Sequence, residues 1–424
     1  MTRKMKDSGI EWIGEIPEDW EVVRIRHKAR VASSGLSLDK LLENGQFAVY
    51  DANNLVGYID ENPVKDDYIS IIKDGAGVGR TRLMPKNTNV IGTMNYIVAN
   101  KIDLNYLFYA LQVFDFEQYS TGSTIPHIYF KDYGNEYIAL PNQEIQKNIV
   151  KILNYKVRKI YRLMERVSEQ IQTLEDYKKS VITEAVTKGL DKNVEMKDSG
   201  IEWIGEIPKY WKVKRLKQIL SNDNDSLKVG PFGSSLKSND LVDSGKWVYN
   251  QRTVLDNNFN SNDTFIDDKK FIELKGFKVK AGDILLTTRG TIGKVAIVPN
   301  NFNEGVIHPC IIKFNLNKDI FKNDLIKFIF NHTDIVLRQV EFLSNSTTIG
   351  VIYSYNLVNI YIPIPSISEQ EQIIEYLDKK TKLIDQAIES KQKQLEVLEE
   401  YKKSLIYEYV TGKKEVGDAH CSFR

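Results

Sequence analysis

The stretch MKDSGIEWIGEIP occupies residues 5–17 and occurs again, letter for letter, at residues 196–208. A tryptophan follows each copy, at Trp20 and at Trp211. A long repeat has to be explained before other features, because it usually marks repeated structural units. Since only two copies are present, the sequence predicts a duplicated protein with two equivalent units and not a solenoid.

The C-terminal part of each unit is repeated as well. The matching positions are Pro141 and Pro365, Gln146 and Gln370, EDYKKS at 175–180 and EEYKKS at 399–404, and Val186-Thr187 and Val410-Thr411. These pairs lie 224 residues apart, whereas the two copies of the first stretch lie 191 residues apart, so the second unit carries 33 more residues in its middle. Each unit therefore has constant ends around a variable centre, which suggests one framework that presents two different recognition surfaces.

The composition indicates a folded, non-membrane chain. Its 424 residues favour two or three domains, and 42% hydrophobic with 10% aromatic residues is enough for folded cores. No apolar run approaches the roughly 18 residues of a membrane-spanning helix, and the first residues lack the apolar segment of a signal peptide. Two cysteines, Cys310 and Cys421, indicate a reducing compartment. The formal net charge of +1 excludes little, so the local charge distribution has to decide whether nucleic acid is bound.

The variable centres predict compact α/β domains. In the first unit the patterns predict strands at 46–50, 68–72 and 90–94 and a helix at 106–119. In the second unit they predict strands at 246–249, 283–287 and 295–298 and a helix at 321–332.

A long helix is predicted after Pro141 and another after Pro365, and Ser366 with Glu369 forms a possible capping box for the second. Apolar residues recur at the three-to-four spacing of a coiled coil, in register between the two copies. They are Leu153, Val157, Ile160, Met164, Val167, Ile171 and Leu174 in the first helix, and Leu377, Ile384, Ile388, Leu395, Leu398 and Leu405 in the second. The polar residues Lys178, Thr381 and Lys391 interrupt the stripe and are expected to fix its register. We therefore expect an antiparallel pair related by pseudo-two-fold symmetry, about 70 Å long at ~1.5 Å per residue, with one variable domain at each end.

Basic segments follow the repeated stretch in both units. The candidate phosphate contacts are Arg24, Arg26, Lys28 and Arg30 in the first unit, and Lys214, Arg215 and Lys217 in the second. A solvated amphipathic element is the alternative interpretation of either segment.

Two glycine-rich segments with nearby cations, at residues 75–79 and 290–294, follow predicted strands. Glycine lets a backbone approach DNA closely, and arginine can pair with guanine. The candidates are Lys73, Gly77, Arg80 and Arg82 in the first unit, and Arg289, Thr291 and Lys294 in the second. Ordinary β-turns with exposed cations are the alternative.

Other polar clusters have residue types suited to base edges or phosphates. They are Tyr50, Asn53, Asn54, Ser123, Thr124 and His127 in the first unit, and Ser234, Ser235, Lys237, Tyr249, Asn250, Gln251, Arg252, Ser346 and Thr347 in the second. Turn chemistry alone could explain any one of these clusters.

No catalytic motif is convincing. Glu273-Leu-Lys275 lacks the upstream acid of a nuclease site, and no N-P-P-[YF] or D-P-P-[YF] run for amino-group methylation is present. Neither glycine segment completes a nucleotide-binding fingerprint, and the five histidines show no spacing typical of metal ligands. We expect no catalytic residue and no metal site in this chain.

With these features together, the chain resembles the specificity (S) subunit of type I restriction-modification systems over nearly its whole length. The resemblance depends on DSGIEWIGEIP before each variable centre, GPFGSSLK at 230–237, Gly-Asp-Ile-Leu-Leu at 282–286, the helix opening with Glu369-Gln370 and Ile373 after IPIP, and the Tyr-Lys-Lys-Ser endings. The first helix departs from it, because NQEIQ at 142–146 stands where a Glu-Gln pair is common.

The resemblance implies an α/β (α+β) fold with two target recognition domains separated by the helix pair. The implied boundaries are domain 1 at 1–141, spacer helix 1 at 142–190, domain 2 at 191–365, spacer helix 2 at 366–412 and a tail at 413–424. We expect the polar end of this tail, Gly417 to Arg424, to be unordered. Each domain would read one half of a bipartite, asymmetric site in double-stranded DNA. The helices would set the spacer and dock two modification (methyltransferase) subunits, which restriction (helicase-nuclease) subunits can join. The implied chain has no activity or cofactor of its own, the modification subunits use S-adenosylmethionine, and the location is the cytoplasm of a bacterium or archaeon.

A coiled-coil scaffold that joins proteins without touching DNA is the rival interpretation. The near-neutral charge favours it, whereas the paired basic segments and cationic glycine loops oppose it. A standalone DNA-cutting or DNA-methylating enzyme is a third interpretation, and the missing motifs argue against it.

Overall fold

The computed structural model describes residues 3–122, 125–223, 225–344 and 350–416, and the predicted tail lies largely outside these residues. The contacts divide the chain into unit 1, formed by Met1–Glu169 and Lys391–Arg424, and unit 2, formed by Gln170–Ser390. The division falls inside two long helices, α4 (Gln143–Lys188) and α10 (Ile367–Val410), so each helix contributes one part to each unit. Among the described residues, no helix has the length and apolar character needed to cross a membrane.

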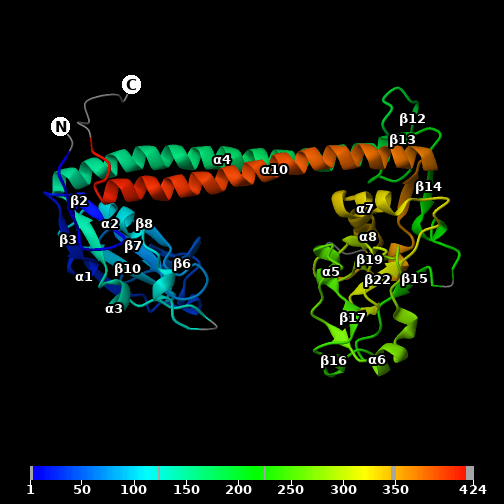
Figure 1. The fold of residues 1–424 in the computed structure, drawn as a ribbon, viewed down its shortest axis with the longest axis horizontal. Helices are drawn as coiled ribbons and strands as arrows, with labels where there is room; N and C mark the ends of the chain where they lie inside the picture. The colour runs from blue at the N-terminus through cyan, green and yellow to red at the C-terminus, as the bar shows by residue number, and fades with distance from the viewer. Residues whose placement is uncertain (1–2, 123–124, 224, 345–349, 417–424) are drawn as a thin grey trace. The chain divides into compact units, whose positions relative to one another are not determined.

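Unit 1 is built on two small sheets (Figure 1). The antiparallel sheet has the order β4 (Ala29–Ser33), β10 (Met94–Ala99), β7 (Tyr68–Ile72) and β8 (Thr81–Met84). The second sheet has the order β6 (Leu55–Ile59), β5 (Phe47–Tyr50) and β9 (Asn89–Val90), and β5 runs parallel to β9. Helix α2 (Leu104–Leu111) contacts β7, β8 and β10, and the short α3 (Phe130–Tyr133) follows it.

Unit 2 repeats this strand order although its central sequence differs. Its antiparallel sheet has the order β15 (Leu227–Val229), β22 (Ile311–Phe314), β19 (Ile284–Thr287) and β20 (Val295–Ile297). Its second sheet has the order β16 (Leu241–Val242), β18 (Phe265–Ile266), β17 (Lys246–Tyr249) and β21 (Gly305–Ile307), with β17 parallel to β21. Helices α7 (Asn323–His332) and α9 (Ser354–Leu357) correspond to α2 and α3. The additional helices α5 (Gln251–Leu255), α6 (Asp268–Glu273) and α8 (Ile335–Ser344) contain much of the inserted sequence.

Most predicted elements are present, and two predictions for the first centre are wrong. The strands predicted at 68–72 and 246–249 coincide with β7 and β17. The strand predicted at 90–94 is instead a connection, because β9 ends at Val90 and β10 begins at Met94. The helix predicted at 106–119 ends at Leu111, since the following aromatic residues turn into the core, where Phe114 packs on Trp12 and Phe116 on Tyr133. The spacing of the aromatic residues at 106–119 therefore indicates that they are buried, and it does not indicate how long the helix is.

The repeated first stretch folds in the same way twice. It forms hairpins β1 (Met5–Asp7) with β2 (Glu15–Pro17), and β12 (Met196–Asp198) with β13 (Glu206–Pro208). The hairpin loop begins with an Asx turn in both copies, in which Asp7 and Asp198 accept the N–H of Gly9 and Gly200 at 2.9 Å.

A strand pair closes each unit beneath its hairpin. It joins β3 (Glu21–Arg24) to β11 (Tyr137–Leu140) in unit 1, and β14 (Lys212–Arg215) to β23 (Tyr361–Ile364) in unit 2. The Arg24 guanidinium donates to the Tyr137 hydroxyl at 2.9 Å, and Arg215 donates to Tyr361 at 3.0 Å. The same arginine–tyrosine contact therefore joins the two strands that enclose the variable centre of each unit.

The long helices pack against each other antiparallel within each unit. In unit 1 the Lys402 ammonium lies 3.3 Å from the Tyr161 hydroxyl, and in unit 2 Lys178 forms an ion pair with Asp385 at 2.7 Å. The residues of the predicted stripe are all buried or half-buried. Thr381 satisfies its hydroxyl within its own helix by donating to the Leu377 carbonyl at 2.8 Å.

The hairpin of each unit also meets the end of a long helix. Gly189 and Gly412 follow α4 and α10 with φ of +75° and +74°, a conformation that favours glycine. A Cβ on Gly412 would lie 2.5 Å from Pro17, and one on Gly189 would lie 3.2 Å from Trp211. The Tyr407 hydroxyl adds a hydrogen bond to the Trp12 carbonyl at 3.0 Å. In unit 1 the described parts of the first hairpin and of the end of α10 thus form one structure.

Candidate nucleic-acid interface

In unit 2, loops that follow four strands converge at one edge of the sheets. The Gly230 N–H donates to Ile311 at 2.8 Å, the His308 N–H to Tyr249 at 2.9 Å, and the Thr288 N–H to Cys310 at 3.0 Å. These bonds join the ends of β15, β17, β19 and β21. The loops bring the predicted residues of three separate segments, at 230–237, 250–252 and 289–291, to this edge.

The 289–291 loop lies against the start of α5. Gly290 has φ +66°, and a Cβ at this position would lie 3.1 Å from the Gln251 amide nitrogen. Its neighbours Arg289 and Thr291 are exposed. Glycine therefore allows the two loops to lie close together. Arg289 stays on the surface, where its side chain could contact a base or a phosphate.

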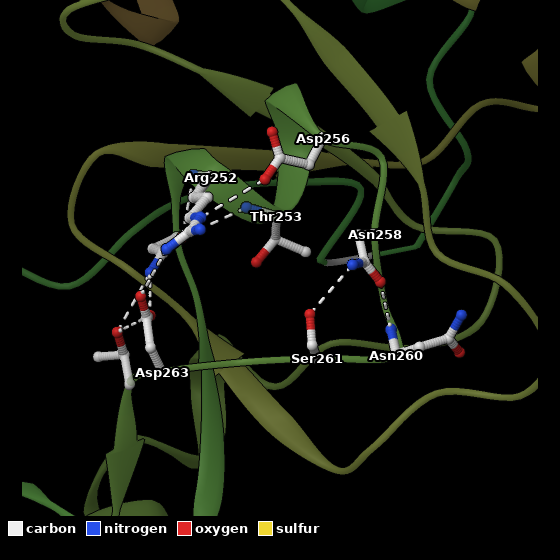
Figure 2. A network of polar contacts seen from close by, with 9 residues as sticks. Arg252, Thr253, Asp256, Asn258, Asn260, Ser261 and Asp263 are labelled. Carbon is white, nitrogen blue, oxygen red and sulfur yellow. Dashed lines mark hydrogen bonds and ion pairs between the residues drawn. The ribbon is translucent and has the colours of Figure 1, made fainter. Parts of the chain in front are cut away.

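Arg252, by contrast, lies among acids. Figure 2 shows its guanidinium between Asp256 and Asp263, with nitrogen–oxygen distances of 3.5 and 3.3 Å. Polar residues of the following loop, including Asn258 and Ser261, complete a cavity of about 260 Å³. Because two carboxylates neutralise its charge, Arg252 is a weaker candidate for a phosphate contact than Arg289.

The corresponding loops of unit 1 are joined in the same manner. The Ile91 N–H donates to Tyr50 at 3.1 Å, and the Lys73 N–H donates to Thr93 at 3.1 Å. The Arg80 guanidinium donates to the Asn53 side chain at 2.8 Å. Arg82 lies over the Tyr50 ring, 5.3 Å from its centroid. The structure therefore brings the glycine segment and the Tyr50–Asn54 segment, which the sequence analysis had considered separately, into one site with a cavity of about 320 Å³.

His127 lies on the other side of the same glycine segment. Its Nδ1 lies 2.8 Å from Asp74, which also pairs with Lys73 at 3.5 Å. Gly75, Gly77 and Gly79 all have φ between +84° and +93°, and a Cβ on Gly79 would overlap Phe116. The loop conformation therefore requires glycine, and His127 and Lys73 share one carboxylate.

Two predicted contacts do not lie at this edge. Tyr249 is fully buried and donates its hydroxyl to the Asn303 carbonyl, so it is a core residue and its prediction as a DNA contact is wrong. Lys294 donates to the Asn331 carbonyl at 2.7 Å, in a crevice that is also lined by α4 and α10 residues of unit 2. Burial lowers the pKa of Lys294. Its ammonium therefore lies apart from Arg289 and Thr291, and its role as a DNA contact stays a prediction.

The predicted basic segments divide into two groups. Arg24 and Arg215 are held by tyrosines in the closing strand pairs, so their primary contacts are structural. Arg26, Arg30 and Lys217 are exposed, and Lys28 and Lys214 are half-buried. Of the polar clusters, Ser234, Ser235 and Lys237 are exposed, whereas Ser123, Thr124, Ser346 and Thr347 lie outside the described residues.

The sequence analysis missed the partners of several predicted residues. Asp74, Asp256 and Asp263 neutralise cations that it had treated as free. It also passed over Phe232, although this residue stands inside the GPFGSSLK motif and is 84% exposed. Burial lowers the pKa of His308 and raises that of the neighbouring Cys310 thiol, so burial favours the neutral form of both side chains. Among the described residues, no three His, Cys, Asp or Glu side chains gather in a way that could hold a metal ion.

The two units coincide with two matches to one sequence family. The profile of the type I restriction modification DNA specificity domain matches residues 17–173 and 208–400. The chain belongs to this type I specificity family. Each match begins at the proline that ends a repeated stretch, so the family's domain is present twice in this chain.

Relatives of known name extend over the whole chain. The type I restriction enzyme MjaVIII specificity subunit of Methanocaldococcus jannaschii is 28% identical over 423 residues, which cover 95% of this chain and 94% of that relative. The putative MjaX specificity subunit of the same organism is 27% identical, with 95% and 96% covered. One solved structure has the same fold, with a TM-score of 0.65 and 14% sequence identity; it concerns complex assembly and conformational transition of the type I R-M system. The match covers 94% of this chain and 99% of that chain.

Proposed function

We propose that this chain is the DNA-specificity subunit of a type I restriction-modification complex, and that each unit reads one half of a bipartite site in double-stranded DNA. One observation carries the proposal: two units of the same strand order present different side chains on equivalent loops. Unit 1 offers Asn53, Arg80 and Arg82, whereas unit 2 offers Gln251, Arg289 and Thr291. Since arginine favours guanine and asparagine or glutamine favours adenine, the two half-sites should differ in sequence.

Recognition of the DNA sequence depends on the loops described above and needs no catalytic group in this chain. Exposed cations such as Arg26 and Lys217 would neutralise phosphates and place each unit in register, whereas the loop side chains would distinguish base edges. Methyl transfer would belong to modification subunits that carry S-adenosylmethionine. We place the complex in the cytoplasm, where bacterial and archaeal DNA is found.

Docking of the modification subunits is assigned to the long helices. Each unit exposes apolar side chains on its part of the helix pair, apart from the buried stripe. They are Tyr155, Tyr161, Leu163, Val397 and Tyr401 in unit 1, and Tyr177 and Leu383 in unit 2. Tyr177 and Tyr401 occupy equivalent positions in the repeated Tyr-Lys-Lys-Ser segments. Two equivalent surfaces suit two copies of one partner, and restriction subunits could join the assembly afterwards.

The proposal is tested by expressing the chain together with its cognate modification subunits and mapping methylated bases in the cellular DNA. The expected result is one motif with two unlike halves that disappears when this chain is omitted. A stable complex that methylates no defined motif would contradict the proposal and favour a scaffold. A Tyr177→Ser, Tyr401→Ser double variant should lose the modification subunits, whereas the exposed Ile272→Ser variant should retain them.

A further inference from the structure

The loop after β15 holds an aromatic side chain out in solvent. Phe232 is 84% exposed, more than any other large hydrophobic residue among those the structure describes. It lies within the segment from Gly230 to Lys237, whose hydroxyl and ammonium groups make the surrounding surface polar. A single exposed apolar residue needs no explanation by itself. Two further observations make Phe232 notable: hydrogen bonds and buried neighbours fix its loop, and the corresponding loop of unit 1 also exposes an apolar side chain.

Anchors on both sides hold this loop. The Gly230 N–H donates to Ile311, and a Cβ on Gly230 would lie 2.2 Å from the His308 carbonyl oxygen. Pro231 is buried on one side of Phe232, and Leu236 is buried on the other. The Ser235 N–H closes a turn by donating to the Phe232 carbonyl at 2.8 Å. The loop therefore presents Phe232 at a defined position, which a flexible loop would not do.

Unit 1 presents an apolar side chain on the equivalent loop. This loop follows β4, which corresponds to β15 in strand order, and its Leu38 is 63% exposed. It is anchored as well, because the Leu36 carbonyl accepts the Gly92 N–H at 2.7 Å and the Ser34 hydroxyl accepts the Leu36 N–H at 3.2 Å. The two residues differ in type and in position within the loop. Phe232 is the third residue after β15, whereas Leu38 is the fifth after β4 and begins a 3-10 helix that corresponds to Ser238–Asp240 in unit 2. Both are nevertheless apolar, exposed and carried by an anchored loop.

The position of these residues indicates what they meet. The Gly230 anchor rests on the His308–Cys310 segment, and the Thr288 N–H, next to Arg289, donates to the Cys310 carbonyl. Phe232 thus belongs to the same loop cluster as the polar and cationic residues assigned to DNA. An apolar side chain among cations matches a stacked base step, which is apolar between its base pairs and is flanked by phosphates.

We propose that Phe232 and Leu38 are wedges that enter a base-pair step of each half-site, partly unstack it and kink the duplex. The inference rests on the proposed function and adds a second kind of readout to it. Pyrimidine–purine steps such as TA and CA unstack most easily, so a wedge would favour them without a hydrogen bond to either base.

The test uses the whole complex of this chain with its modification subunits, and a duplex that carries its methylation motif. 2-Aminopurine is placed in turn at each position of the half-site read by unit 2, apart from the base that the complex methylates. We expect a severalfold rise in fluorescence at one step when the wild-type complex binds. The rise should be lost with Phe232→Ser and kept with Phe232→Leu, and Leu38→Ser should abolish the signal only in the other half-site. The matched control is Ile272→Ser, which removes an exposed apolar side chain of α6 in the same unit.

Three results would overturn the inference. One is a fluorescence rise that is unchanged in Phe232→Ser. Another is a Phe232→Ser chain that no longer co-purifies with the modification subunits, since Phe232 would then be a protein contact. The third is a wild-type complex that methylates a defined motif but unstacks no step outside the methylated base. In that case the proposed function would stand, whereas methylation without any motif would remove both.

Discussion

The indole nitrogen of Trp211 donates a hydrogen bond to the Glu369 carboxylate, with 3.1 Å between Nε1 and Oε1. Glu369 also completes the predicted capping box of α10, in which the Ser366 hydroxyl accepts the Glu369 N–H at 3.3 Å. One carboxylate therefore connects the repeated hairpin to the start of the long helix. In unit 1 the equivalent position is Ile145, and Trp20 Nε1 has no hydrogen-bond partner among the described residues. The departure from the family's Glu-Gln pair thus leaves one buried donor unsatisfied.

Glu369→Ala should destabilise unit 2 by about 1–3 kcal/mol, because it leaves the buried Trp211 donor without an acceptor. Glu369→Gln keeps an acceptor oxygen and should lose less. Urea unfolding followed by tryptophan fluorescence measures the difference. Glu375→Ala, which removes only an exposed ion pair with Lys379, is the control. Equal losses from Glu369→Ala and Glu375→Ala would show that the indole bond contributes little.

Arg289→Ala should weaken binding to the half-site read by unit 2 by about 1–3 kcal/mol and relax its sequence preference, because an arginine that reads a base contributes discrimination as well as charge. Arg252→Ala should have a smaller effect, since Asp256 and Asp263 already neutralise that side chain. Competition binding with single-base variants of the methylation motif measures both quantities. A loss from Arg289→Ala that is equal on random DNA would identify a phosphate contact instead.

Adding one heptad to both long helices, between Ile160 and Leu174 and at the facing part of α10, should lengthen the permitted spacer. Seven helical residues add about 10 Å, which corresponds to about three base pairs at ~3.4 Å each. Methylome mapping reads the new spacer directly. Motif halves at the original separation would contradict the expectation that helix length sets the spacer.

Acid should destabilise unit 2 through His332. Burial, together with the positive charges of Lys178 and Lys294, lowers the pKa of His332 to about 4, against roughly 6.5 when unfolded. The unfolded chain therefore binds more protons between these values, so the stability from neutral His332 is present above pH 6.5 and is lost as the pH falls towards 4. His332→Asn should flatten the fall in melting temperature between pH 7 and pH 5. His27→Asn, at an exposed site, controls for general acid effects, and parallel curves for His332→Asn and wild type would contradict the prediction.

The repeat made the framework predictable from sequence. Gln146 and Gln370 were matched by spacing alone, and the structure gives both the same contacts. Gln146 accepts the Asp103 N–H at 2.9 Å, and Gln370 accepts the Lys322 N–H at 2.8 Å. Each connects the start of a recognition-domain helix to a long helix, so one side chain had to be kept in both copies.

The recognition surfaces were less predictable, because residue type does not show which neighbours a side chain meets. Arg252 and Arg289 are both arginines beside polar turns, but only the folded structure places two aspartates on Arg252. Tyr249 ends the strand Lys-Trp-Val-Tyr, whose residues show no alternation of polar and apolar types. The burial of its side chain goes with the parallel pairing with β21, which brings together residues 249 and 307. Long-range pairing of this kind leaves no local signal in a single sequence.

The contact between Gly412 and the Pro17–Trp20 segment has a consequence for synthesis of the chain. Unit 2 is one continuous segment, whereas unit 1 needs residues that follow all of unit 2. At about 5–20 residues per second, the apolar residues of the first hairpin wait roughly 20–80 seconds for their partners at the end of α10. During that time Ile13, Ile16 and Trp20, which are buried in the finished unit, lack part of their cover and are exposed to chaperones and proteases on the ribosome.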